Sequence, residues 1–177
     1  MKKSVQAAVG GVCAALSVAV MLCSGIFYVF TYAVPMIFGL VMMFLKRTFS
    51  SSCAWCVYIA VSILSIILVP DKESVLMYTL FFGYYPIIKS NIDKIKFKLI
   101  RNIVKLLIFN LAVAAVECIA YFIFGIPFFE DGNFSAAMII LFTVLMNVTF
   151  VLFEFLLKNF MILYERKLEK RILKIFK

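Results

Sequence analysis

The chain has 177 residues, of which 66% are hydrophobic and 15% charged, and its mean hydropathy is +1.10. A soluble domain is about half apolar and about a quarter charged, so the composition excludes an ordinary soluble globule and a disordered chain. An integral membrane protein remains. A formal net charge of +9 is compatible with binding to nucleic acid, with binding to anionic lipid, or with the basic loops of a membrane protein. The positions of the charges decide among these.

The first apolar stretch, residues 4–45, contains no charged side chain. As one helix its 42 residues would measure about 63 Å at about 1.5 Å per residue. A bilayer core is only about 30 Å thick. We therefore expect two spans joined by an uncharged turn, either at Ser24-Gly25 or within residues 31–35, where turn-forming residues occur.

Charged or Pro-containing segments separate the other apolar runs. We expect six spans, two of them within residues 4–45 and the others at residues 53–69, 74–88, 103–124 and 135–157. The run at 74–88 is short. We interpret it as a tilted or locally thinned crossing, and a re-entrant or buried segment is the alternative.

The charges assign sides to these spans. With six spans both termini share one side, and of the 18 Lys and Arg residues only Lys72 falls on the other. The positive-inside rule makes the basic side cytoplasmic. The outer side carries four acids, at positions 71, 73, 130 and 131. The excess of basic over acidic residues is then explained by the membrane topology and by attraction to an anionic inner leaflet. No nucleic acid partner is expected.

The predicted fold is therefore an all-α integral membrane bundle of six transmembrane helices with both termini cytoplasmic. Residues 1–157 would form the transmembrane domain and residues 158–177 a basic amphipathic cytoplasmic tail. Residues 89–102 have a similar pattern, so we expect a second basic amphipathic helix there. Both segments would contact membrane lipids or, alternatively, a cytoplasmic or coupling partner.

Glu117 is the most informative single residue, because it lies in the middle of a predicted span. A charge at mid-bilayer costs about 2.5–3.5 kcal/mol on insertion scales. The carboxyl group therefore serves either a ligand or ion site, or a neutralised hydrogen bond between helices. Tyr121 lies one turn further along the same face. The predicted solute-binding residues are Glu117, Tyr121, Asn147, Glu73 and Tyr32.

Three other polar residues within spans have a simpler interpretation. Glu154 precedes Lys158 by four residues, the favourable order for a helical ion pair, and we interpret it as an interfacial, snorkelling side chain. Asn110 and Asn147 are expected to bridge helices. Asn147 could instead line a cavity.

Small residues recur every four positions along the first helix, at Ala7, Gly11, Ala15 and Ala19. Such a stripe lets another helix approach closely. Packing within the bundle and docking onto a separate membrane partner are the two interpretations.

No catalytic constellation emerges. The chain has no His, no P-loop and no nucleophile motif. Cys53 and Cys56 form one isolated Cys-x-x-Cys, which we interpret as small apolar helix residues. We therefore expect neither an enzyme nor a bound metal or cofactor.

The small-residue stripe and the run at residues 14–20 resemble the first helix of the substrate-binding S components of energy-coupling factor (ECF) vitamin and metal transporters. The stretch from Val69-Pro70-Asp71-Lys72-Glu73 to Phe82-Gly83-Tyr84-Tyr85-Pro86 is similar to small membrane proteins of low-GC Gram-positive bacteria.

This resemblance implies a multi-pass protein of a bacterial cytoplasmic membrane that captures a small solute, such as a vitamin, near the outer face. Its first-helix stripe would dock on a transmembrane coupling subunit driven by two ATPases, and the bundle would topple to carry the solute. The acidic outer side favours a cationic or neutral solute. The alternatives are a self-contained secondary transporter in which Glu117 titrates, and a non-transporting assembly or regulatory protein that acts through its basic segments.

Overall fold

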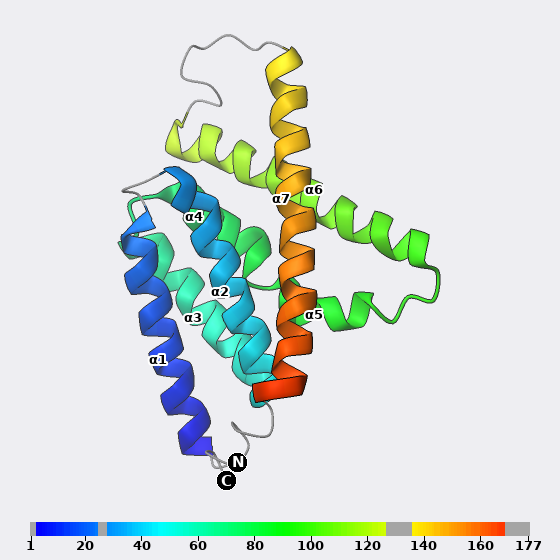
Figure 1. The fold of residues 1–177 in the computed structure, drawn as a ribbon. Coiled ribbons are helices and arrows are strands. Elements are labelled where there is room, and N and C mark those ends of the chain that lie inside the picture. The colour runs from blue at the N-terminus through cyan, green and yellow to red at the C-terminus, as the bar shows by residue number, and fades with distance from the viewer. Residues whose placement is uncertain (1–2, 25–27, 127–135, 169–177) are drawn as a thin grey trace.

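The computed structural model describes residues 3–24, 28–126 and 136–168, and every regular element in these ranges is helical. In chain order the elements are α1 (Lys3–Leu22), α2 (Tyr28–Thr48), α3 (Ser51–Leu68), α4 (Lys72–Met77), the π-helix η2 (Tyr78–Phe82), α5 (Tyr85–Ile92), α6 (Lys98–Phe124), α7 (Ala136–Leu163) and the π-helix η3 (Tyr164–Leu168). The predicted all-α class is confirmed for this part of the chain (Figure 1).

Among the described residues, four helices are long and apolar enough to cross a membrane: α1, α3, α6 and α7. They correspond to the first, third, fifth and sixth predicted spans. The second predicted span is α2, which is 21 residues long but contains Pro35 and ends in Lys46 and Arg47. Residues 28–45 contain no charged side chain, and α2 is not among the four helices counted over the described residues. A total of six crossings stays a prediction, as does the cytoplasmic side of the termini.

The turn after the first helix lies at the earlier of the two predicted places. α1 ends at Leu22 and α2 is already helical at Tyr28. The alternative turn, residues 31–35, lies inside α2. Asp71 links the ends of the first two helices to its own segment, because its carboxylate accepts hydrogen bonds from Ser24 Oγ at 3.2 Å and Thr31 Oγ1 at 3.0 Å. It also caps α4 through the Ser74 amide at 3.1 Å.

The fourth predicted span, residues 74–88, is not one helix. α4 passes into the π-helix η2, which closes with a 2.8 Å hydrogen bond from the Gly83 amide to the Tyr78 carbonyl. Pro86 then stands in the first turn of α5, where its missing N–H leaves no helical bond unmade. The segment is deeply enclosed: the side chains of Tyr78, Phe81 and Phe82 are fully buried.

An aromatic core surrounds this broken segment. Phe81 stacks on Tyr85 with ring centroids 4.6 Å apart, and Phe82 meets Phe153 of α7 edge-on at 4.8 Å. At Gly39 of α2 a Cβ atom would lie 2.8 Å from both the Phe82 carbonyl oxygen and the Phe153 ring. Only glycine lets α2 approach that closely. A second apolar cluster joins α1, α2 and α3.

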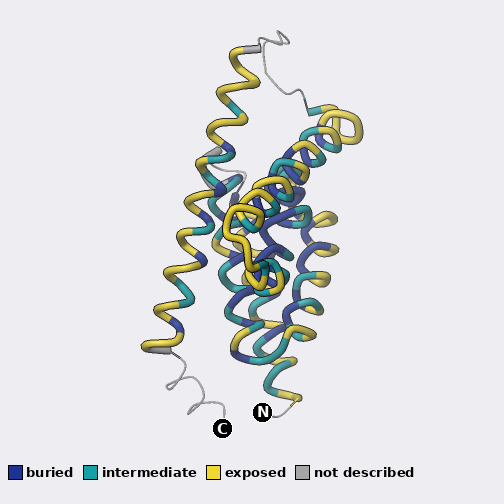
Figure 2. The backbone as a smooth tube through the Cα atoms, turned by 90° about the vertical axis from the view of Figure 1, so that its right-hand side faces the viewer, coloured by how far each residue is buried: buried dark blue, intermediate teal, exposed yellow. Residues whose placement is uncertain are grey.

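α6 and α7 differ in inclination. α6 has 27 residues, about 40 Å at about 1.5 Å per residue. Figures 1 and 2 show it strongly inclined to α7, and a tilted helix is one way to fit such a length into a bilayer. Much of the outer surface of both helices is apolar and exposed (Figure 2), as expected of surfaces in contact with lipid.

The predicted amphipathic helix at residues 89–102 is wrong in extent. α5 ends at Ile92, the chain turns, and α6 begins at Lys98. The turn between α5 and α6 includes Asp93, which pairs with Lys105 in a cluster of charges described below. At the other end, α7 continues past Leu157 to Leu163, and the helical path extends as η3 to Leu168. The remainder of the predicted tail, residues 169–177, lies outside the described residues.

Candidate functional site

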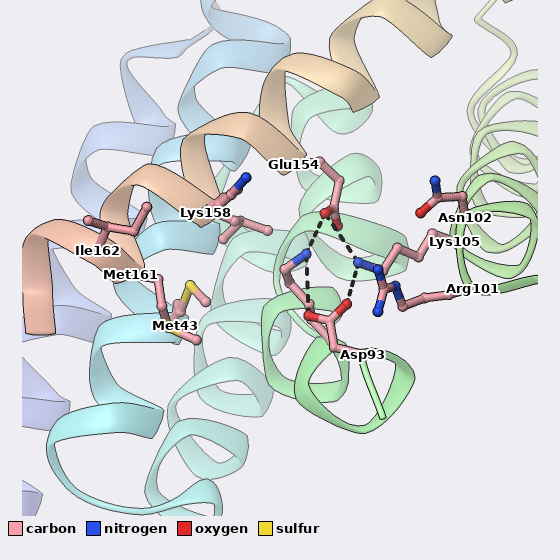
Figure 3. A pocket seen from close by; sticks show the side chains of 11 residues that line it. Met43, Asp93, Arg101, Asn102, Lys105, Glu154, Lys158, Met161 and Ile162 are labelled. Carbon is pink, nitrogen blue, oxygen red and sulfur yellow. Dashed lines mark hydrogen bonds and ion pairs between the residues drawn. The ribbon is translucent and has the colours of Figure 1, made fainter. Parts of the chain in front are cut away.

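Four charged side chains, from α5, the turn that follows it, α6 and α7, meet where the three helices converge (Figure 3). Glu154 of α7 accepts hydrogen bonds from Lys89 Nζ and from the Tyr85 hydroxyl, and Lys105 Nζ lies 3.3 Å from the same carboxylate. Asp93 Oδ1 lies 2.5 Å from Lys105 Nζ, and its Oδ2 lies 3.7 Å from Lys89 Nζ. We call Lys89, Asp93, Lys105 and Glu154 the charged network.

Three of the four side chains of the charged network are largely withdrawn from solvent, and the fourth, Asp93, is 40% exposed. The side chains of Lys89 and Lys105 are 9% and 7% exposed, and that of Glu154 is 23% exposed. An unpaired charge at such a depth would be strongly unfavourable. Here two ammonium groups face two carboxylates, so the cluster is neutral and each charge has a partner. The network therefore fixes α5, α6 and α7 relative to one another.

The favourable spacing of Glu154 and Lys158 does not lead to an ion pair between them. The ion pairs of Glu154 run to Lys89 and Lys105, and none joins it to Lys158 among the described residues. Lys89 and Lys105, which are 65 and 49 residues from Glu154 in the sequence, bind its carboxylate in place of the neighbouring Lys158. The position of Lys105 in the sequence does indicate that it needs an acidic partner, because it falls inside the predicted span 103–124, where an ionisable residue requires one.

A cavity of about 410 Å³ opens beside the charged network. The side chains that line it, most of them labelled in Figure 3, are Met43, Lys89, Asp93, Arg101, Asn102, Lys105, Glu154, Leu157, Lys158, Met161 and Ile162. A second cavity of about 290 Å³ shares Met43, Lys89, Asp93 and Met161 with it and adds Lys46 and Arg47 of α2. We call the first of these the basic cavity.

Three of the five predicted solute-binding residues lie near one another at the opposite end of the bundle. Tyr32 of α2 is under the electrostatic influence of both Glu73 and Glu117, and Glu73 also acts on Glu117. All three side chains are half-buried. Burial and the neighbouring Asp71 carboxylate raise the pKa of Glu73. The structure thus brings a residue from α2, one from α4 and one from α6 into one acidic region.

Asn147 and Tyr121 have other surroundings. Asn147 and Asn110 exchange hydrogen bonds between their side-chain amides at 3.0 and 3.2 Å, which joins α7 to α6. The predicted bridge between helices is therefore present. Tyr121 is 45% exposed, and its ring meets that of Phe122 edge-on at 5.2 Å. A role for either residue in solute binding stays a prediction.

The small-residue stripe of α1 lies on the surface. Ala7, Gly11, Ala15 and Ala19 are all exposed. The neighbouring Gly10 is buried against α3, where an added Cβ would lie 3.0 Å from Val57 Cγ2. A groove of about 490 Å³ follows the line between α1 and α3 and includes Ala7 and Gly11 in its lining. Packing of α1 within this bundle therefore uses a different face from the stripe.

The described residues contain no group of three or more His, Cys, Asp or Glu side chains that could hold a metal ion. All five cysteines, including Cys53 and Cys56, are free thiols. Comparison of the chain with family models, with curated proteins and with solved structures found no match. What the fold defines is a helical protein with four helices long and apolar enough to span a membrane in its described part, which supports a membrane location.

Proposed function

We propose that this chain is the membrane-embedded solute-capture subunit of an ATP-driven importer of the ECF type. The observation that carries the proposal is the exposure of the α1 stripe. A helix that only packs within its own bundle has no need of a second small face, and α1 already packs on α3 through Gly10 and Ala14. Small side chains on an outer face allow the backbone of another membrane helix to approach closely.

The partner in this proposal is a transmembrane coupling subunit with associated ATPases. The chain contains no P-loop, so any ATP hydrolysis must come from another protein. The groove between α1 and α3 borders the stripe and provides a recess for side chains of a docking helix. Docking would thus use Ala7, Gly11, Ala15 and Ala19.

The acidic region around Glu73, Glu117 and Tyr32 is the proposed capture site. It lies at the end of the bundle away from the N-terminus of α1, which positive-inside topology makes the outer end. Two carboxyl groups and a phenol hydroxyl suit a cationic or neutral solute better than an anion. The proposed sidedness also puts Lys46, Lys89 and Lys158 at the cytoplasmic end.

Docking is tested with Ala15→Leu, which adds a bulky side chain to the middle of the stripe. The tagged chain is purified in mild detergent from the membranes of the cell that makes it, and ATP hydrolysis in the purified sample is measured. Ala114→Leu, an exposed alanine on α6, is the matched control. We expect the wild type and the control to retain ATP hydrolysis and Ala15→Leu to lose at least tenfold. Equal activity in all three, or none in the wild type, would contradict the proposal.

Capture is tested separately by native mass spectrometry of the same samples. We expect the wild type to retain a small molecule that Glu117→Gln loses. Glu165→Gln, which removes an exposed acid at the other end of the molecule, should retain it. Loss in both variants, or in neither, would remove Glu117 from the site.

A further inference from the structure

We propose that the basic cavity binds the phosphate group of an anionic ligand, with Arg101, Lys158 and Asn102 as the recognising side chains. This site lies at the opposite end of the molecule from the acidic region and is independent of the proposed importer function. Three features of the cavity support this binding: two charges that the network leaves unpaired, the types of hydrogen-bond donor in the lining, and the position of the cavity beside an exposed apolar helix surface.

The lining of the basic cavity has an excess of cations. It contains four basic side chains and two acidic ones. Lys89 and Lys105 are neutralised by Glu154 and Asp93 within the charged network. The excess is therefore carried by Arg101 and Lys158, whose side chains have no ion pair or hydrogen bond among the described residues. Positive charges gathered around one recess repel each other, and a bound anion offsets that repulsion.

The donors suit phosphate. A guanidinium can donate two parallel hydrogen bonds to two phosphate oxygens, and an ammonium adds a compact charge. Asn102 follows Arg101 directly and supplies an amide N–H. In Figure 3, Arg101 and Asn102 lie on one side of the charged network and Lys158 on the other, and all three line the basic cavity. The volume of about 410 Å³ lies within the usual range of about 300–1,000 Å³ for ligand pockets.

A lipid headgroup is the source of phosphate that the position favours. Ile162 lines the basic cavity and is itself on the exposed apolar surface of α7, next to Leu163. A headgroup in the cavity would therefore leave its acyl chains against a helix surface suited to lipid. Basic pockets between transmembrane helices on the cytoplasmic side are known to hold anionic headgroups. Lys46 and Arg47, beside the adjoining cavity, add to the positive potential there.

The network and the cavity act together in this proposal. Glu154 and Asp93 hold the two buried lysines in fixed positions, so the floor of the cavity is preorganised and neutral. Arg101 and Lys158 at its rim then provide the affinity. Because rim charges are screened by salt, binding should weaken as ionic strength rises.

The test titrates the full-length protein in detergent with phosphatidylglycerol, with phosphatidylcholine and with inorganic phosphate. Native mass spectrometry follows bound lipid, and calorimetry follows inorganic phosphate. The test variant is Arg101→Gln/Lys158→Gln. The matched control is Arg166→Gln/Lys96→Gln, which removes the same charge from exposed residues outside both cavities. Thermal unfolding of each variant verifies that the fold is retained.

We expect phosphatidylglycerol to bind at least tenfold more tightly than phosphatidylcholine, with at least a tenfold loss in the test variant and less than threefold in the control. Binding of phosphatidylglycerol alone identifies a lipid headgroup as the ligand. Binding of inorganic phosphate alone, lost in the test variant, identifies a soluble phosphate compound and still supports the site. Equal losses in both double variants, or no binding of either anion, would overturn the proposal.

Discussion

Replacing Glu154 by glutamine removes one charge from the network while nearly preserving the shape of the side chain. The glutamine carbonyl can still accept the hydrogen bond from Tyr85. What is lost is the counter-charge for Lys89 and Lys105, whose side chains are 9% and 7% exposed. Asp93 would be their remaining acidic partner, and its side chain is 40% exposed. Glu154→Gln therefore tests the electrostatic part of the network rather than its packing.

Removing one partner of a buried ion pair costs about 3–5 kcal/mol. Glu154 is 23% exposed and borders the basic cavity, so water can partly solvate the two lysines in the variant. The lower part of the range then applies, and we expect a loss of about 3 kcal/mol in the free energy of unfolding. This corresponds to more than about 100-fold in the unfolding equilibrium, since about 1.4 kcal/mol is tenfold.

The assay is reversible unfolding in mixed detergent micelles with increasing dodecyl sulfate, followed by the fluorescence of Trp55, the one tryptophan of the chain. Glu165→Gln, an exposed acid in η3, is the control for a general charge effect. Adding Lys89→Met to Glu154→Gln should recover about 1–3 kcal/mol relative to the sum of the single losses. An effect of Glu154→Gln within about 0.5 kcal/mol of its control, a change typical of surface positions, would show that Glu154 does not stabilise the fold by neutralising the two lysines.

Two further predictions concern contacts between helices. Gly39→Ala should destabilise the protein by about 1–3 kcal/mol, because the new methyl group would meet a carbonyl oxygen and an aromatic ring at 2.8 Å; Gly11→Ala, whose methyl group would meet nothing within 4 Å, is its control in the same unfolding assay. Asn147→Leu should cost about 0.6–1.7 kcal/mol, and adding Asn110→Leu should restore most of it, since no unpaired amide then remains. Equal effects of the two glycine variants, or a further loss in the double leucine variant, would contradict these assignments.

The long helices could be predicted because membrane crossing demands long uninterrupted apolar runs. The runs at 53–69, 103–124 and 135–157 all lie mostly within single helices of the structure. The broken segment at 72–92 could not be predicted in the same way. Its π-helical turn depends on aromatic packing against α6 and α7, which hydropathy along the chain does not encode.

The candidate sites show the same limit. Glu117 stands out in the sequence because its flanks are apolar, and the structure puts it near Glu73 and Tyr32, two other residues of the predicted set. Glu154 stands out equally, because its flanks are also apolar. Its partner Lys89, however, lies in a basic segment whose charges indicate only the topology of the chain. Sequence spacing favours the i, i+4 neighbour Lys158. The three-dimensional arrangement shows instead that Lys89 and Lys105 pair with the Glu154 carboxylate.

The charged network also bears on how the protein enters the membrane. Lys89 and Lys105 are synthesised before α7, so while α6 inserts their acidic partner in the charged network is Asp93 alone. Glu154 adds the second carboxylate only when α7 packs against the two lysines. The charges of the network balance at that point. Full pairing of the network thus depends on α7, and a nascent chain shorter than 154 residues has two lysines of the network facing one carboxylate.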